Sequence, residues 1–346
     1  FLRRRPPSAA LTAGVGTDAP PFGSGGPAWE PRWGCSAACA RRGVDQFREN
    51  FVTLEWVTDA FLEDMRGGAK REVPKINNLP AYRAALAPHI KRRIPQEPLV
   101  AKDVQIPVPN RQEPHVLSFD DEHLGFYLKV ADDFAQWWGQ SKGGQQPTPG
   151  DSTRRVNPLM MLLVRIGAVV RANNIPQRFG NGGEFVWRGG LTSKQRFAIE
   201  RLQELVEAKE KVLLFCHNPE TVELLHRELA KQGIDSVRAH GGIPIAKRYS
   251  DIQKGFRHGG TPLMLATTGV AQAGMDLPEA SRVVYYDRDW ASKVEDQALA
   301  RALRPQTAHD VVAEWIHLEG SIDEYMAQMV DFKRDCFKAG VDWCTP

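Results

Sequence analysis

One glutamine and two arginines are the residues of this chain best suited to phosphate chemistry. Gln297, Arg301 and Arg304 follow one another at spacings of four and three residues. On a helix, residues at these spacings lie on one face, so the pattern predicts that the three side chains project together. A guanidinium donates in a planar fork that matches phosphate oxygens. Two of them on one face suit the charge of a triphosphate better than they suit an ordinary solvated helix.

A tight turn and a pair of hydroxyls precede this segment. Gly274 and Asp276 form a Gly-x-Asp turn, where a glycine lets the backbone approach a ligand closely. Thr267 and Thr268 stand at the end of a predicted strand, where hydroxyls can donate to the phosphate oxygens of a duplex. Ordinary loops contain such turns too, and strand-end hydroxyls often only cap a strand. The sequence therefore predicts ligand contacts here and leaves those simpler interpretations open.

Strand and helix patterns alternate regularly after residue 190. Short apolar runs predict strands at 212–216, 236–239, 263–266, 283–286 and 311–318. Thr192 with Gln195 predicts a capping box at the start of the first helix, and Gly233 predicts the end of the second. This alternation predicts a parallel sheet with helices on both faces.

The rest of the chain is less regular. Residues 1–45, rich in Ala, Gly, Pro and Arg, lack apolar periodicity and predict an irregular or disordered leader. Residues 46–186 predict a mainly helical segment, with helical patterns in 46–86, at 120–138 and, buried, at 159–172, and an extended run at 100–108. The α/β region is expected over 187–334, followed by a tail at 335–346.

Composition excludes several classes of protein. No apolar run reaches the roughly 18 residues that a membrane-spanning helix needs. The net charge of +3 is close to balance, so any basic surface for nucleic acid must be local. Five scattered cysteines fit reduced thiols better than a zinc site or a disulfide framework. We therefore predict no metal site, and a cytoplasmic, nucleoid-associated or nuclear protein.

The motifs together resemble a known family. Residues 187–334 resemble the C-terminal RecA-like lobe of superfamily-two helicases, most closely the Swi/Snf-related double-stranded DNA translocases. The resemblance is carried by KVLLFCHNPETVELLHREL (211–229), HGG (240–242), LATTGVAQAGMDLPEA (265–280), YYDRDW (285–290) and QALARALRPQ (297–306). Residues 46–186 resemble, more weakly, the segment that joins the two lobes in this family.

The resemblance implies a RecA-like fold and the C-terminal half of an ATP-dependent DNA translocase or helicase. It implies that Arg301 and Arg304 act as arginine fingers and that Gln297 orients water or nucleotide. It places Gly274 and Asp276 at the nucleotide. It implies contacts to the DNA backbone from Thr267, Thr268, Arg248, Arg92 and Arg93. ATP and Mg²⁺ are the expected cofactors of the complete two-lobe protein, and double-stranded DNA is its expected partner.

The phosphate-binding half of such a motor is missing from the sequence. No Gly-x-x-x-x-Gly-Lys-Ser/Thr loop occurs. The run 120–123, Asp-Asp-Glu-His, is not the magnesium motif, because its His stands one place too early; it predicts an ordinary helix start. We therefore expect an N-terminal RecA-like lobe as a partner, and negligible ATP hydrolysis by this chain alone. The alternative is a catalytically inactive nucleic-acid-binding or scaffold module with a RecA-like fold.

Overall fold

The computed structural model of the chain describes residues 46, 49–58, 70–76, 78–88, 97–142, 158–180, 183–271 and 276–341. The predictions made for 1–45, Arg92, Arg93 and Gly274 lie outside these residues. The chain divides into two compact units. One comprises Phe1–Asp59 and Gly68–Ile90, and the other comprises Ala60–Gly67 and Lys91–Pro346. Each unit is described by itself.

The first unit contains an antiparallel pair of strands, β1 (Val52–Thr58) and β2 (Lys70–Ile76), and the helix α3 (Leu79–Leu86). The prediction of helix throughout 46–86 is therefore wrong for both strands. Strand β1 reads VTLEWVT, and its β-branched and aromatic residues favour an extended backbone over the helix that its apolar spacing suggested. Helix α3 agrees with the prediction.

The second unit is built on a seven-stranded parallel sheet. Its strand order is β3-β9-β8-β5-β7-β6, and β4 also pairs with β9, beyond β3 along the same edge. The strands are β3 (Asn110–Arg111), β4 (His115–Leu117), β5 (Val212–Cys216), β6 (Ser236–Ala239), β7 (Leu263–Thr267), β8 (Arg282–Tyr285) and β9 (Val312–Leu318). The predicted strands after residue 190 are thus confirmed, to within one residue at each end.

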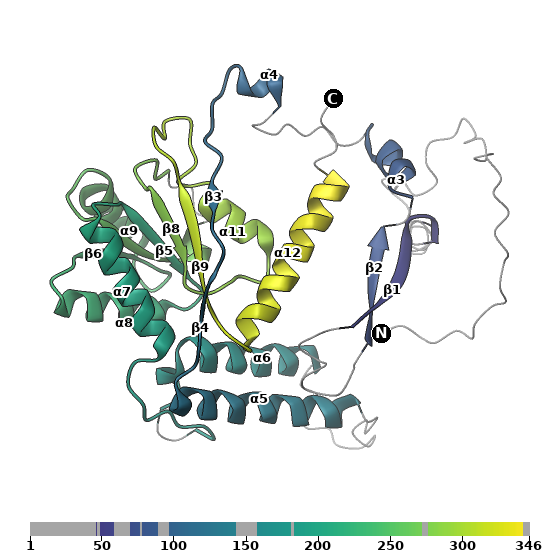
Figure 1. The fold of residues 1–346 in the computed structure, drawn as a ribbon, viewed down its shortest axis with the longest axis horizontal. Helices are drawn as coiled ribbons and strands as arrows, with labels where there is room; N and C mark the ends of the chain where they lie inside the picture. Colours follow the sequence, from purple (N-terminus) through teal and green to yellow (C-terminus); the bar gives the residue numbers. More distant parts are fainter. Residues whose placement is uncertain are drawn as a thin grey trace. The chain divides into compact units, whose positions relative to one another are not determined.

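Helices cover both faces of this sheet (Figure 1). The helices of this unit are α4 (Pro98–Ala101), α5 (Asp121–Lys142), α6 (Pro158–Asn174), α7 (Ser193–Glu207), α8 (Pro219–Lys231), α9 (Ile245–Asp251), α10 (Thr268–Ala271), α11 (Ser292–Leu299) and α12 (Ile322–Val341). A 3₁₀ turn, η1 (Pro176–Arg178), and a π-helical segment, η2 (Ile252–Arg257), complete the set. The predicted capping box of Thr192 and Gln195 is present at the start of α7.

Alternation along each strand creates two cores, one on each face of the sheet. Leu213 and Phe215 of β5 belong to the core shared with η2 and α11. Leu214 and Cys216, between and after them, belong to the core shared with α7 and α8. Successive strand residues point to opposite faces, so a strand that is apolar at every position must be covered on both sides. All five residues of β5 are buried, as that rule requires.

Helices α5, α6 and α12 form a third cluster, in which Phe126, Tyr127, Val169 and Met326 are buried. Because β3 and β4 pair with β9 and α6 contacts α12, the residues on either side of the boundary predicted at 186/187 belong to one compact unit. Helix α12 continues to Val341, so residues 335–341 of the predicted tail are helical.

The two halves of helix α6 differ in burial. Its C-terminal half is buried as predicted, but three apolar residues of its first half, Met160, Leu163 and Val164, are more than half exposed. Among the described helices, none is both long enough and apolar enough to cross a bilayer.

Candidate functional site

The carboxyl ends of three neighbouring strands bring Thr267 and Thr268, and two residues that were not predicted, to one edge of the sheet. Strand β5 lies between β7 and β8, and all three run parallel. The residues that follow them, His217, Thr268 and Asp287, therefore leave the sheet at the same edge. Loops beyond the carboxyl ends of parallel strands are where open α/β sheets bind ligands.

Two predicted motifs meet elsewhere, between the segments that lead into β8 and β9. The guanidinium of Arg304 forms an ion pair with Asp276, with 2.5 Å between Nη2 and Oδ1. The backbone N–H of Leu277, the residue after Asp276, donates to the carbonyl of Arg301 at 2.9 Å. Residues that the sequence assigned to a turn and to a separate helix thus form one contact. Asp276 is exposed and Arg304 is partly exposed, so the pair is open to solvent.

The helical face predicted for Gln297, Arg301 and Arg304 does not form. Helix α11 ends at Leu299, and the next backbone bonds, Arg301 N–H to the Ala298 carbonyl and Ala302 N–H to the Leu299 carbonyl, span three residues. Gln297 is exposed on α11, whereas both arginines lie in the turns beyond it. In a continuing helix the Arg301 carbonyl would accept from the N–H of residue 305, but Pro305 has none. This carbonyl accepts from Leu277 instead.

Thr307 stabilises the turn that carries the second arginine. Its hydroxyl accepts from the backbone N–H of Arg304 at 3.1 Å and donates to the carbonyl of Ala302 at 2.6 Å. A hydroxyl that bridges two backbone groups in this way replaces the hydrogen bonds that a helix would have supplied. The sequence analysis missed Thr307, and no signal in the sequence marks it.

Asp276 acts on both arginines of this contact. Burial lowers the pKa of Arg301, the neighbouring Arg304 lowers it further, and Asp276 opposes the change. The Nε of Arg304 is buried and lacks a hydrogen-bond partner among the described residues. A guanidinium with an unused donor is chemically suited to an anion.

Thr267 and Thr268 lie at the end of β7, as predicted, but their side chains are only 5% and 2% exposed. The hydroxyl of Thr268 is 3.5 Å from Asp289 Oδ2. The same carboxylate lies 3.8 Å from Nδ1 of His217 and raises the pKa of that imidazole. In this state both threonine side chains are directed into the protein, and the hydroxyl of Thr268 faces a carboxylate.

Asp287 is a buried carboxyl at the same edge that the sequence analysis did not select. Its side chain is 2% exposed, and Oδ1 accepts the backbone N–H of His217 at 2.7 Å. Burial raises its pKa to about 7, while Lys194 and His217 oppose the rise. A strand-end position within YYDRDW is the signal that would have identified it.

Replacing Asp287 by asparagine should change how stability depends on pH. In the folded protein the pKa of Asp287 is about 7, above the ordinary value of 3.8. The stability that this carboxyl contributes is therefore fully present at low pH and is lost between about pH 4 and 7. Asparagine keeps the acceptor for His217 without titrating. The free energy of unfolding of D287N relative to the parent should therefore rise by roughly 2–3 kcal/mol between about pH 5 and about pH 8. Urea unfolding at both pH values measures this, and a difference independent of pH would refute it.

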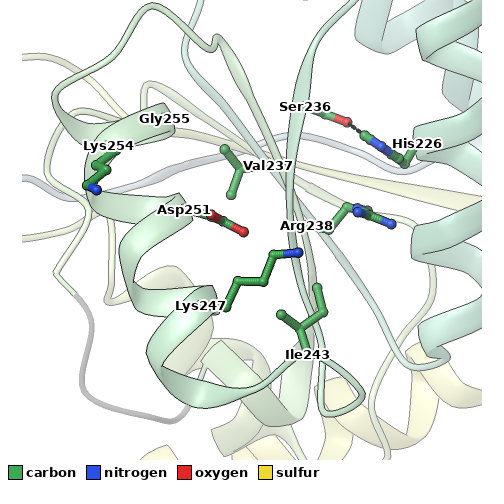
Figure 2. Close-up of a pocket in the computed structure, with 9 residues that line it drawn as sticks. All are labelled: His226, Ser236, Val237, Arg238, Ile243, Lys247, Asp251, Lys254 and Gly255. Atoms are coloured by element: carbon green, nitrogen blue, oxygen red, sulfur yellow. Dashed lines mark hydrogen bonds between the residues drawn. The ribbon is translucent and has the colours of Figure 1, made fainter.

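Arg248 and Lys247 occupy the helix that follows the HGG loop. The Arg248 guanidinium donates to the carbonyl of His240 at 3.0 Å, so one of its donors holds that loop. Lys247 is exposed and projects into a pocket of about 390 Å³ against β6, across from Arg238 (Figure 2). Arg238 is itself paired with Glu223 at 2.6 Å. Of Lys247 and Arg238, Lys247 is therefore the cation more available to an anionic ligand.

The acidic run at 120–123 has a structural role. Asp120 accepts the backbone N–H of Ser193 at 2.7 Å and pairs with Arg196 at 2.5 Å. His123 is buried, with Nε2 placed 2.8 Å from the Ala172 carbonyl. The run precedes and begins α5, which agrees with the helix start predicted for it.

Trp290 packs edge-on against Tyr325, with 6.4 Å between ring centroids.

Comparison with known proteins agrees with this architecture. Residues 197–306 match the helicase conserved C-terminal domain family. The chain is similar to the SNF2 domain-containing protein ENL1 of Oryza sativa subsp. japonica, with 28% identity over 153 residues. That match covers 44% of this chain and 15% of the rice protein. The chain thus spans a small part of the length of this curated relative.

Two solved structures share the fold. The C-terminal part of the Fun30 ATPase domain aligns with a TM-score of 0.50 at 17% identity, covering 65% of this chain and 90% of that one. The Sulfolobus solfataricus SWI2/SNF2 ATPase core domain aligns with a TM-score of 0.51 at 17% identity, covering 85% of this chain and 53% of that one. At this identity the two structures establish the RecA-like fold.

Proposed function

We propose that this chain, a Swi/Snf-related helicase C-terminal lobe, is the second half of an ATP-dependent DNA translocase. The observation that carries the proposal is the meeting of Asp276 with Arg304 and Arg301, where the segments that lead into β8 and β9 come together. A loop that binds nucleotide and a pair of arginine fingers must be adjacent for one lobe to complete a triphosphate site. The backbone bond from Leu277 to Arg301 supports that adjacency independently of the side chains.

The residues of this lobe fit one side of an ATP site. Arg301 and Arg304 would hold the phosphate oxygens, and Asp276 would keep Arg304 in place until an anion arrives. ATP supplies a transferable phosphoryl group whose developing charge guanidinium groups stabilise. The phosphate loop and the carboxylates for Mg²⁺ would come from an N-terminal RecA-like lobe.

Duplex DNA is the proposed track. Lys247 is exposed beside the HGG loop, and Arg248 holds the loop through the His240 carbonyl. We therefore assign the direct contact to the DNA phosphates to Lys247. Arg248 and the buried Thr267 and Thr268 would instead hold the protein backbone near Lys247 in shape. A protein with this role acts where DNA is stored, so a nuclear or nucleoid location is part of the same proposal.

A salt titration tests the DNA contact. The chain should bind a fluorescent duplex with the weak affinity of non-specific binding, a Kd of about 10⁻⁴–10⁻⁶ M, and log K should fall linearly with log salt. Lys247→Ala should reduce the magnitude of that slope by about 0.9, because one fewer counterion is released. Fluorescence anisotropy at several salt concentrations measures both quantities.

Lys231→Ala provides the matched control. Lys231 is an exposed cation on α8 that already pairs with Glu228, so its loss should leave the slope unchanged. If Lys247→Ala and Lys231→Ala behave alike, the HGG helix does not contact DNA. Duplex binding that does not depend on salt would contradict a contact to the DNA phosphates and would count against the translocase proposal.

A further inference from the structure

A long groove lies on the side of the sheet opposite α7. It has a volume of about 1090 Å³ and is lined by β9, the β3–β4 segment, α11 and α12. In Figure 1 the β3–β4 segment runs beside β9 along the edge of the sheet. The apolar part of the lining includes Val108, Val116, Leu299, Leu303, Trp315 and Phe337. The groove is separate from the contact between Asp276 and Arg304.

The edge of the sheet is covered on one face and bare on the other. In β4, His115 and Leu117 face α7: the first contacts Phe197, and the second packs in the core of that face. Val116, between them, points to the opposite face and is 53% exposed, and Val108 nearby is 67% exposed. Parallel sheets are normally covered on both faces. Within the described residues no helix covers this part of the sheet.

The floor of the groove contains two polar atoms without partners. Trp315 and His317, two residues apart on β9, line the groove and are only 6% and 3% exposed. Neither Nε1 of Trp315 nor Nε2 of His317 has a hydrogen-bond partner among the described residues. The Trp315 ring is held rigidly, stacked on Tyr285 with 5.4 Å between centroids. Buried polar groups in folded proteins nearly always find partners, so these two indicate a group that is not present here.

The charge of the groove favours a cationic occupant. Its arginines are already paired: Arg111 with Asp296, and Arg288 and Arg334 with Asp331. Three further carboxylates of the lining, Glu113, Glu324 and Asp335, have no ion pair among the described residues. The groove therefore combines an apolar floor with an acidic rim.

We propose that this groove binds an amphipathic helix of a partner protein whose apolar face is flanked by lysine or arginine. The apolar face covers the exposed Val108 and Val116, and the basic flanks meet the carboxylates Glu113, Glu324 and Asp335. Helices bind grooves in this way through apolar residues repeated every three or four positions. An acceptor on the occupant, such as a side-chain amide oxygen or a C-terminal carbonyl, accepts a hydrogen bond from the indole N–H of Trp315. The inference is independent of ATP and of the arginine pair.

Peptide binding to the complete chain tests the proposal. The probe is a fluorescent helical peptide of leucine and lysine with an i, i+3, i+4, i+7 leucine pattern, compared with the same peptide carrying glutamate in place of lysine. The lysine peptide should bind at least about tenfold more tightly in anisotropy titrations. Hydrogen exchange should then show protection in β4 and α12.

Paired variants locate the site. Val108→Gln with Val116→Gln should weaken binding of the lysine peptide about tenfold, because two exposed apolar contacts are lost without disturbing the core. Met160→Gln with Leu163→Gln removes a comparable apolar surface from α6 and should change nothing. Equal affinity for the two peptides, an equal loss in the α6 control, or displacement of the probe by short duplex DNA would each overturn the proposal.

Discussion

Arg304→Ala in the complete two-lobe protein should lower DNA-stimulated ATP turnover by about a thousandfold or more, with nucleotide affinity largely retained. The reason is that a guanidinium placed against the phosphoryl group acts on charge that develops only in the transition state. In the present structure Arg304 is within an ion-pair distance of Asp276, 2.5 Å, and shares that carboxylate's field with Arg301. Arg301→Ala should have an effect of the same order. Steady-state hydrolysis and a fluorescent-nucleotide titration measure the two quantities separately.

Two further variants make this result specific. Arg227→Ala removes an exposed arginine of α8 that pairs only with its neighbour Glu228, and turnover should not change. Thr307→Val removes the hydroxyl that holds the backbone of Arg304, so it should lower turnover by less than loss of the arginine itself. Full turnover in Arg301→Ala/Arg304→Ala would show that neither arginine acts on the phosphoryl group, and no turnover in the parent would favour the alternative, an inactive nucleic-acid-binding or scaffold module.

Lys194→Met should destabilise the fold by roughly 3–5 kcal/mol, because it leaves a charge buried without its partner. Lys194 and Asp323 are both fully buried, with 2.6 Å between Nζ and Oδ2. The ammonium also donates to Asn174 at 2.7 Å and lies 5.0 Å from the centroid of the Tyr286 ring. This one side chain therefore connects α7, α6 and α12. Urea unfolding of the parent and the variant measures the loss.

Compensating and surface variants separate charge from packing. Asp323→Asn added to Lys194→Met should recover part of the lost stability, because it removes the unpaired charge and keeps the acceptor for Leu318 N–H. Lys231→Met breaks an exposed pair with Glu228 and should cost at most about 1 kcal/mol. A loss in Lys194→Met no larger than in Lys231→Met would show that the buried pair contributes no more than a surface pair.

The groove beside β9 adds a way in which a partner protein could meet this lobe away from the nucleotide. Its floor, Trp315 and His317, belongs to the same strand that carries Glu314 on the opposite face. Glu314 is hydrogen-bonded by Arg201, Arg282 and His115, whereas Nε1 of Trp315 and Nε2 of His317 have no hydrogen-bond partner among the described residues. The polar side chain on one face of β9 is thus hydrogen-bonded, while those on the other face have donors or acceptors to spare.

The sequence by itself determined the regular part of this protein. Strand β5 is apolar at every position and β6 is short and bounded by turns, so local pattern and burial lead to the same answer. The capping box at Thr192 and the left-handed Gly233, with φ of 78°, follow from local backbone chemistry. The order of motifs along the chain was sufficient to identify a RecA-like lobe.

Only the tertiary structure decided where the chemistry is concentrated. The spacing of Arg301 and Arg304 predicted one helix face, but α11 ends at Leu299, the Arg301 carbonyl bonds to Leu277, and the pairing with Asp276 sets the position of Arg304. Such contacts join residues distant in the chain, so no local periodicity can encode them. In 52–58 the same spacing of apolar residues fitted helix and strand, and pairing with 70–76 selected the strand. Burial of Asp287 and of the Lys194–Asp323 pair likewise depends on elements that meet only when the sheet is assembled.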